Sequence, residues 1–173
     1  MKVLLVFVVS ADGKITKWGD PNVKSWSSQE DQHYFTRLIS SAPLVVLGSN
    51  TWRADPIKAK DNRMMIVLTR DPDRYKEFEV TGKLEFSAES PSHLVKKYRK
   101  MGYEQMLVAG GPQVATSFLK EKLIDEIWLT VEPVIFGTGG CFVTENPLDI
   151  QLKLLSAERW NARGTMLLKY TIE

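Results

Sequence analysis

The feature that most constrains the fold is a short apolar run that ends in two glycines and passes directly into a helical pattern, at residues 105–119. The run is too short for a helix and does not alternate, which is typical of a strand buried on both faces. Gly110 and Gly111 permit a sharp turn, and Pro112 suits the first position of a helix. Such a helix N-terminus favours a phosphate group, although an ordinary tight turn fits the same pattern.

The remaining chain repeats this alternation of short apolar runs and helical patterns. Strands are expected at residues 2–9, 44–47, 64–68, 83–86, 105–108 and 126–131, and the alternating segments 152–160 and 165–172 predict a closing antiparallel hairpin. Ser28, Ser49 and Ser90 precede three further helical patterns as candidate caps. The sequence therefore predicts one α/β domain over residues 1–173, with a mostly parallel central sheet and helices on both faces.

The composition argues against several classes of partner. A formal charge of +2 gives no reason to expect nucleic acid or an anionic membrane. The single cysteine, Cys141, excludes an intrachain disulfide, and His33 and His93 lack metal-ligand spacing, so no metal site is expected. The first apolar run is too short to span a membrane and no small-residue cleavage site follows it, so we expect a cytoplasmic protein.

Polar and glycine residues follow four of the predicted strands. Asp12 follows the first, Gly48 and the residues up to Thr51 follow the second, Thr69 and Arg70 follow the third, and the glycine pair follows the fifth. In open α/β sheets ligands bind outside the carboxyl ends of the strands, so these residues predict a common ligand site. Their spacing matches neither G-x-G-x-x-G nor a phosphate loop that ends in Gly-Lys-Ser/Thr.

Three motifs resemble the reductase domain of the bifunctional riboflavin-synthesis deaminase-reductase and its stand-alone relatives, within the dihydrofolate reductase superfamily. Residues 10–15 resemble the Ser-x-Asp-Gly-Lys/Arg segment, and residues 48–56 resemble Gly-x-x-Thr-x-Arg-Ala-Asp-x-Pro, one residue shorter. Residues 123–126 and 132–137 resemble Leu-Val-Asp-Glu and Ala-Pro-x-x-x-Gly, with Glu132 in place of the alanine. The deaminase half, with its His-x-Glu and Pro-Cys-x-x-Cys motifs, has no counterpart in this chain.

Other motifs are more similar to dihydrofolate reductase itself. The spacing of Trp26, Asp31 and Phe35 resembles the active-site helix in which an acid holds the pterin ring, and residues 63–69 resemble Arg-x-x-Ile-Ile-Leu-Ser. Residues 47–52 resemble Met-Gly-Arg-x-Thr-Trp, but Ser49 replaces the phosphate-binding arginine. The glycine pair matches one that is joined by a cis peptide bond in that family, a bond that is rare outside X-Pro.

The resemblance implies a reductase that uses NADPH. The residues implied to bind the cofactor come from three strand ends: Gly48, Ser49, Asn50 and Thr51; Leu68, Thr69 and Arg70; and Ala109, Gly110, Gly111, Pro112, Gln113 and Val114. Thr69 and Arg70 would hold the 2′-phosphate, and Arg70 with Arg53 would replace the cation missing at Ser49. Alternatively, Thr51 is only a helix cap and Arg70 only a surface residue.

Asp31 is the candidate catalytic acid, because it lies on the apolar side of its helix with Phe35 and Leu38, where an acid is costly unless paired. Its carboxyl would hydrogen-bond the ring nitrogens of the substrate and favour protonation of the C=N bond being reduced. The alternatives are an acid that suits the helix dipole, or Glu30 in its place. Thr130 and Asp12 are the other catalytic candidates.

Two substrates fit the resemblance. A ribosylamino-pyrimidine phosphate needs a cation such as Lys14, Arg53 or Arg63, whereas dihydrofolate needs the Asp31 contact and an arginine such as Arg63 for its glutamate tail. Trp26, Phe35 and Glu132 are the further substrate-binding candidates. A non-catalytic nucleotide-binding or dimerisation module is the third possibility, and relatives in the riboflavin branch suggest a homodimer through the hairpin at residues 152–172.

Overall fold

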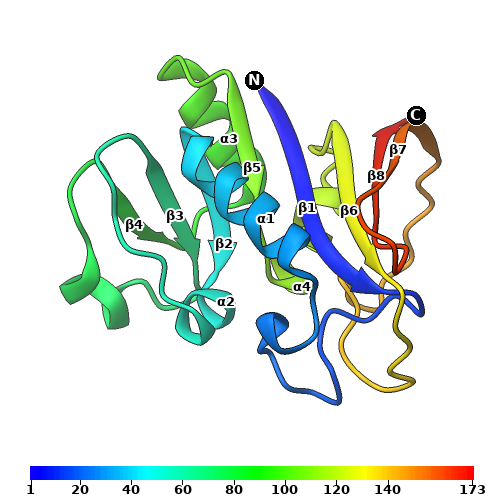
Figure 1. Cartoon of the computed structure of the whole chain (residues 1–173). Coiled ribbons are helices and arrows are strands. Elements are labelled where there is room, and N and C mark those ends of the chain that lie inside the picture. The colour runs from blue at the N-terminus through cyan, green and yellow to red at the C-terminus, as the bar shows by residue number, and fades with distance from the viewer.

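A computed structural model describes all residues, 1–173, and contains one eight-stranded sheet in the order β4-β3-β2-β5-β1-β6-β8-β7 (Figure 1). The strands are β1 (Lys2–Ser10), β2 (Leu44–Gly48), β3 (Met64–Leu68), β4 (Leu84–Ser87), β5 (Gln105–Val108), β6 (Glu126–Glu132), β7 (Leu152–Arg159) and β8 (Met166–Ile172). The strands β1 to β6 pair in parallel, and β8 pairs antiparallel with both β6 and β7. The predicted α/β architecture and closing hairpin are confirmed, and no strand end differs by more than one residue from the expected position.

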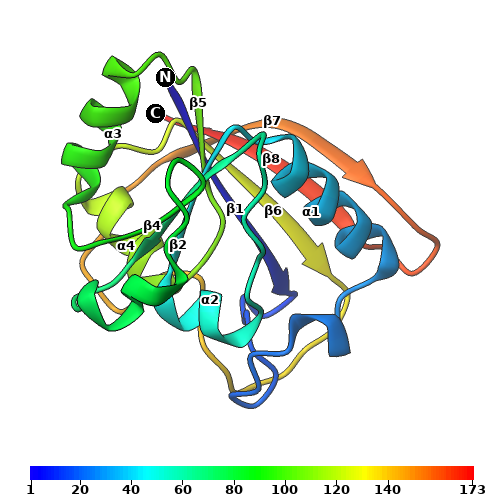
Figure 2. The same cartoon turned by 90° about the vertical axis from the view of Figure 1, so that its left-hand side faces the viewer.

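The helices cover both faces of the sheet, as Figure 2 shows with the sheet seen from its edge. The α-helices are α1 (Gln29–Ser41), α2 (Ser49–Ala54), α3 (Pro91–Lys100) and α4 (Pro112–Lys120), and the 3-10 helices are η1 (Val23–Ser25) and η2 (Asp73–Phe78). Side chains of α1 and α2 pack into one core cluster, and side chains of α3 and α4 pack into the other. The molecule therefore has three layers.

The strand β1 shows why this sequence builds two cores. Its alternate residues Val3 and Leu5 enter the cluster beneath α3 and α4, whereas Leu4 and Val6 enter the cluster beneath α1 and α2. Successive strand side chains point to opposite faces, so a continuous apolar run fills both sides of a covered parallel sheet.

No helix is long and apolar enough to cross a membrane.

The hairpin edge is built differently from the parallel half. Most residues of the outermost strand β7 are exposed, including Leu152, Leu154 and Leu155, at 41%, 53% and 51% of their surface. Its register with β8 shifts between Leu154 and Ser156. The hairpin is thus covered less than the parallel strands, and its edge remains unpaired.

Candidate functional site

A cleft of about 560 Å³ lies at the carboxyl ends of the parallel strands, towards which β1 runs at the lower edge of Figure 1. We call it the strand-end cleft. Its lining comes from the ends of β2, β3 and β4 and from the start of α4. Its lining includes Gly48, Ser49, Asn50, Thr51, Leu68, Thr69, Arg70, Gly111, Pro112, Gln113 and Val114.

Glycines allow the β2–α2 and β5–α4 turns to meet behind this cleft. The N–H of Gly48 donates to the carbonyl of Gly110 at 3.2 Å. A Cβ atom on Gly110 would lie 3.1 Å from the Thr51 methyl group, and one on Gly111 would lie 3.3 Å from the Thr51 hydroxyl. Both glycines have positive φ angles, 148° and 84°, which a side chain would strain. Thr51 therefore packs directly on the glycine pair.

The cleft carries more positive than negative side chains. Arg53, Arg70 and Arg74 line it, together with the acids Asp71 and Glu89. None of the three arginines forms an ion pair, whereas Glu89 lies 3.2 Å from the Lys97 ammonium group. Arg53 donates to the Asn50 side chain, which keeps its guanidinium beside the β2–α2 turn. The cleft therefore offers cations that an anionic ligand can pair with.

Asp31 lies in the first turn of α1 and is buried, with 5% of its surface exposed. Burial, which disfavours the charged form, raises the pKa of its carboxyl to about 6. The hydroxyls of Thr130 and Ser27 favour the ionised form and oppose this shift, while the negative charge of Glu132 adds to it. Asp31 is thus an acid that exchanges its proton near neutral pH.

A second carboxylate, Glu132, is buried at the end of β6, with 3% of its surface exposed. One oxygen accepts the backbone N–H of Ser28 at 2.8 Å, and the other accepts the hydroxyl of Thr165 at 2.7 Å. Thr130, two residues earlier on β6, is 2% exposed. Two acids and a hydroxyl from α1 and β6 therefore share one buried region, which we call the acid pocket.

The sequence of the chain matches a known protein family. The chain matches the family described as RibD C-terminal domain over residues 1–165. It belongs to that family.

Individual proteins are also similar to the chain. An uncharacterised protein YwjB of Bacillus subtilis (strain 168) is 25% identical over 166 residues, 92% of each chain. The structure of a deaminase and 5-amino-6-(5-phosphoribosylamino)uracil reductase from Thermotoga maritima is similar with a TM-score of 0.75 at 18% identity, over 99% of this chain and 56% of that one. A dihydrofolate reductase from Enterococcus faecalis, complexed with NADP(H), is similar with a TM-score of 0.67 at 17% identity, over 99% of this chain and 96% of that one. The fold is therefore dihydrofolate reductase-like.

The RibD-type chain brings most of the predicted cofactor residues together. Of the thirteen predicted cofactor residues, eleven line the strand-end cleft. The other two, Ala109 and Gly110, are buried and do not line it. Arg53, predicted as a substrate residue, also lies in this cleft. The structure contains no cis peptide bond, so the cis linkage that the resemblance implied for the glycine pair is wrong for this structure.

Asp12 joins two loops. Its carboxylate accepts the Ser10 hydroxyl at 2.6 Å and the backbone N–H groups of Phe136 and Gly137 at 3.2 and 2.8 Å. The Ser10 hydrogen bond is the largest cause that lowers the pKa of Asp12 to about 2. Asp12 is therefore ionised at neutral pH and ties the loop after β1 to the loop after β6.

The other substrate candidates lie in three places. Lys14 follows Asp12, and its ammonium group is 3.5 Å from the Cys141 sulfur. Trp26 meets Phe136 edge-on at 5.1 Å between ring centres, and Phe35 packs at the margin of the core beneath α1. Arg63 is 3% exposed and donates to the carbonyls of Ile39 and Lys58, at 3.0 and 2.9 Å. Arg63 precedes β3 and lines neither the strand-end cleft nor the hollow described next.

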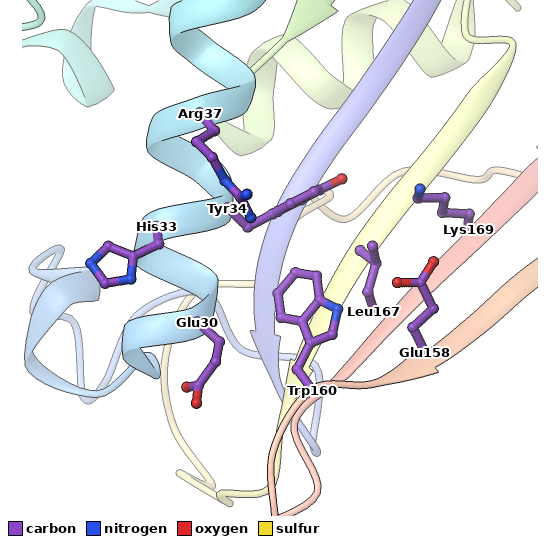
Figure 3. A pocket seen from close by; sticks show the side chains of 8 residues that line it. All are labelled: Glu30, His33, Tyr34, Arg37, Glu158, Trp160, Leu167 and Lys169. Atoms are coloured by element: carbon purple, nitrogen blue, oxygen red, sulfur yellow. The ribbon is translucent and has the colours of Figure 1, made fainter.

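A second hollow of about 480 Å³ lies between α1 and the hairpin, and we call it the helix–hairpin hollow. Figure 3 shows Tyr34 and Trp160 facing one another across it, with ring centres 4.9 Å apart. Burial raises the pKa of Tyr34 to about 12, assisted by the charges of Glu158 and Asp31. Its lining residues are Glu30, His33, Tyr34, Arg37, Glu158, Trp160, Leu167 and Lys169.

Sequence reasoning did not find several of these residues. Ser87 and Glu89 follow β4, so the strand-end argument would have found them if it had been applied to that strand. Arg74 lies in η2, an element that the sequence analysis did not predict. Tyr34 and Trp160 gave no signal in the sequence, because their contact depends on how the hairpin packs beside α1.

No group of three or more His, Cys, Asp or Glu side chains is arranged to hold a metal ion.

Proposed function

We propose that this protein is an NADPH-dependent reductase that transfers hydride to a ribosylamino-pyrimidine phosphate, as in riboflavin biosynthesis. The observation that carries the proposal is the placement of two chemically opposite sites at one edge of the sheet: an arginine-lined, glycine-walled cleft and a buried acid with a pKa of about 6. Membership of the RibD C-terminal domain family supports this activity.

The strand-end cleft fits the cofactor in its chemistry. The three glycines at the two turns leave space that side chains would fill, and three arginines without ion pairs provide charge for phosphates. Backbone N–H groups and hydroxyls of residues 48–51 and 111–114 would hold the pyrophosphate. Thr69 and Arg70 would hold the 2′-phosphate, with Arg53 and Arg74 in place of the cation missing at Ser49. Bound NADPH supplies the hydride, and the protein supplies position and electrostatics.

Asp31 would act at the substrate. Reduction of a C=N bond adds a hydride to carbon and a proton to nitrogen, and an acid that titrates near neutral pH is suited to donate that proton. Thr130 contacts the Asp31 carboxyl and would keep it oriented. Asp31 would then regain a proton from solvent.

The contacts of Arg63 favour the ribosylamino-pyrimidine phosphate over dihydrofolate. The glutamate tail of folate needs an available cation, but both terminal nitrogens of Arg63 donate to backbone carbonyls. The phosphate of the ribosylamino-pyrimidine substrate needs only one available cation. Lys14 would supply it from the loop that Asp12 orders, while Trp26 would border the substrate ring and Phe35 would support it from the core.

The direct test is oxidation of NADPH, followed by its absorbance, with the ribosylamino-pyrimidinone phosphate and with dihydrofolate in parallel assays. We expect turnover of the first substrate and little of the second. Turnover of dihydrofolate alone would assign the chain to the folate branch. Cofactor binding without oxidation in either assay would favour a binding module.

A homodimer is the assembly we propose for this reductase. The exposed leucines of β7 form an apolar strip along an unpaired sheet edge, where a second copy would bury them. Sedimentation equilibrium of the wild type and of Leu154→Lys tests this, with Met101→Lys as a control at an exposed apolar residue outside the hairpin. A monomer for the wild type would contradict it.

A further inference from the structure

Glu132 is a buried carboxylate to which the proposed reaction assigns no step. It stands at the position where the riboflavin-reductase motif has alanine before proline, and its side chain is almost completely removed from solvent. Burying a carboxylate costs several kcal/mol unless strong donors compensate for the lost water. A role that requires the charge is therefore worth seeking in its contacts.

The contacts of Glu132 join the hairpin to the start of α1. Ser28, which donates to one oxygen through its backbone N–H, is also the N-cap of α1, and its hydroxyl accepts the N–H of Asp31 at 3.3 Å. Thr165, which donates to the other oxygen, in turn accepts a hydrogen bond from Asn161 at 2.9 Å. Glu132 therefore fixes the helical turn that carries Asp31.

The charge that acts on Asp31 is negative, and no positive charge balances it. The groups that influence it are Glu132 and Thr130 from β6 and Ser27 from the segment before α1, and Asp31 in turn influences Tyr34 on its own helix. Glu158 from β7 and Arg37 from α1 act on Tyr34, and neither contributes to the pKa of Asp31. No cation shifts the pKa of Asp31, so Glu132 is the charged neighbour that opposes its ionisation.

We propose that Glu132 is a positioning residue for the reductase: it fixes the first turn of α1 against the hairpin and places a negative charge beside Asp31, so that Asp31 holds a proton for the substrate. This inference rests on the proposed function, in which Asp31 is the acid. Glu132 itself touches neither cofactor nor substrate in this role.

The substitution Glu132→Gln separates charge from shape. The amide oxygen can still accept the Ser28 N–H, and the amide nitrogen can donate to the Thr165 oxygen, whereas the charge is lost. We expect the pKa of Asp31 to fall by about one unit, the lower end of the range for a close charge. Carboxyl ¹³C NMR titration of the free protein measures it, with Asp31→Asn to assign the signal.

Glu30→Gln is the matched control. It removes a negative charge from the residue beside Asp31, but Glu30 is exposed at the margin of the helix–hairpin hollow (Figure 3), where solvent screens it. The pKa of Asp31 should stay unchanged in this variant. An equal fall in both variants, or no fall in Glu132→Gln, would overturn the proposal.

Glu132→Ala is the second variant, because it restores the alanine of the family motif. It should lower the pKa of Asp31 as Glu132→Gln does, and it should also lose stability because Ser28 and Thr165 lose their acceptor. A pKa of Asp31 that stays as high as in the wild type in a folded Glu132→Ala protein would equally contradict the proposal.

A kinetic measurement connects the charge to the reaction. In single-turnover reduction, the pH above which the rate declines should be about one unit lower in Glu132→Gln than in the wild type, with NADPH affinity unchanged. The NMR titration needs no turnover. A protein that shows the pKa fall but oxidises no NADPH would therefore refute the proposed function and leave the placement of Glu132 intact.

Discussion

The strand-end cleft and the acid pocket lie at the same edge of the sheet but are built from opposite materials. The lining of the cleft includes glycine turns, hydroxyls and three arginines. The acid pocket centres on two buried carboxylates, Asp31 of α1 and Glu132 of β6. The donors to Glu132 are the backbone N–H of Ser28, just before α1, and the hydroxyl of Thr165, just before β8. One site suits phosphate anions and the other suits a group that must receive a proton.

This difference predicts how each region responds to substitution. A surface with several equivalent donors loses affinity gradually when one side chain is removed. A buried acid whose ionisation depends on a few neighbours changes its chemistry abruptly when one of them is lost. The following predictions separate the two regions by this criterion.

The largest effect is expected from Asp31→Asn. The amide can accept hydrogen bonds from Thr130 but cannot donate a proton as an acid, so the single-turnover rate should fall by about 10² to 10⁴. NADPH affinity, measured by fluorescence titration, should remain within about twofold, the two regions being chemically independent. Full activity in this variant would assign the proton donor elsewhere.

A smaller effect is expected from Arg70→Ala. Loss of one of three cations should weaken the binding of NADPH by about 30-fold, in the range of a charge-assisted hydrogen bond. The binding of NADH should weaken by about threefold. Arg99→Ala, at an exposed arginine of α3 outside the cleft, is the control and should change neither. Equal weakening of both cofactors by Arg70→Ala would remove Arg70 from the 2′-phosphate site.

The difference in stability between Asp31→Asn and the wild type should depend on pH. The folded-state pKa of Asp31, about 6, lies above its ordinary value of 3.8, so the folded protein binds this proton more tightly than the unfolded chain. The resulting stability is present below pH 3.8 and is lost as pH rises through 6. The free energy of unfolding of Asp31→Asn should therefore exceed that of the wild type by about 3 kcal/mol at pH 7, and by little at pH 4, in urea unfolding. A less stable variant at pH 7 would contradict the raised pKa.

The smallest effect is expected from Asp12→Asn. The variant retains an acceptor for one loop amide but loses the charge that holds two of them. Hydrogen exchange at Phe136 and Gly137 should accelerate by about tenfold, the equivalent of one modest hydrogen bond. NADPH affinity and the exchange of β5 amides serve as internal controls and should not change. Unaltered exchange at both loop amides would show that Asp12 does not hold the loops together.

The cleft was more predictable from sequence than the acid pocket. Neighbouring parallel strands end at one edge, so residues 48–51, 69–70 and 110–114 had to meet once the strands were recognised. Arg63 could not be placed by motif alone, because it precedes its strand and donates to backbone carbonyls. The partner of Glu132 depends on β8 lying between β6 and β7, an order that alternation in the hairpin does not reveal.

The insertion of β8 between β6 and β7 also sets an order of events during synthesis. On the ribosome, every residue that lines the strand-end cleft emerges before Thr165, and so does Asp31 itself. Until the segment before the last strand is translated and docked, Glu132 lacks its hydroxyl partner, and the surroundings of Asp31 are incomplete. If the proposed function holds, the residues of the cofactor cleft are therefore synthesised before the contact that completes the surroundings of the proposed acid.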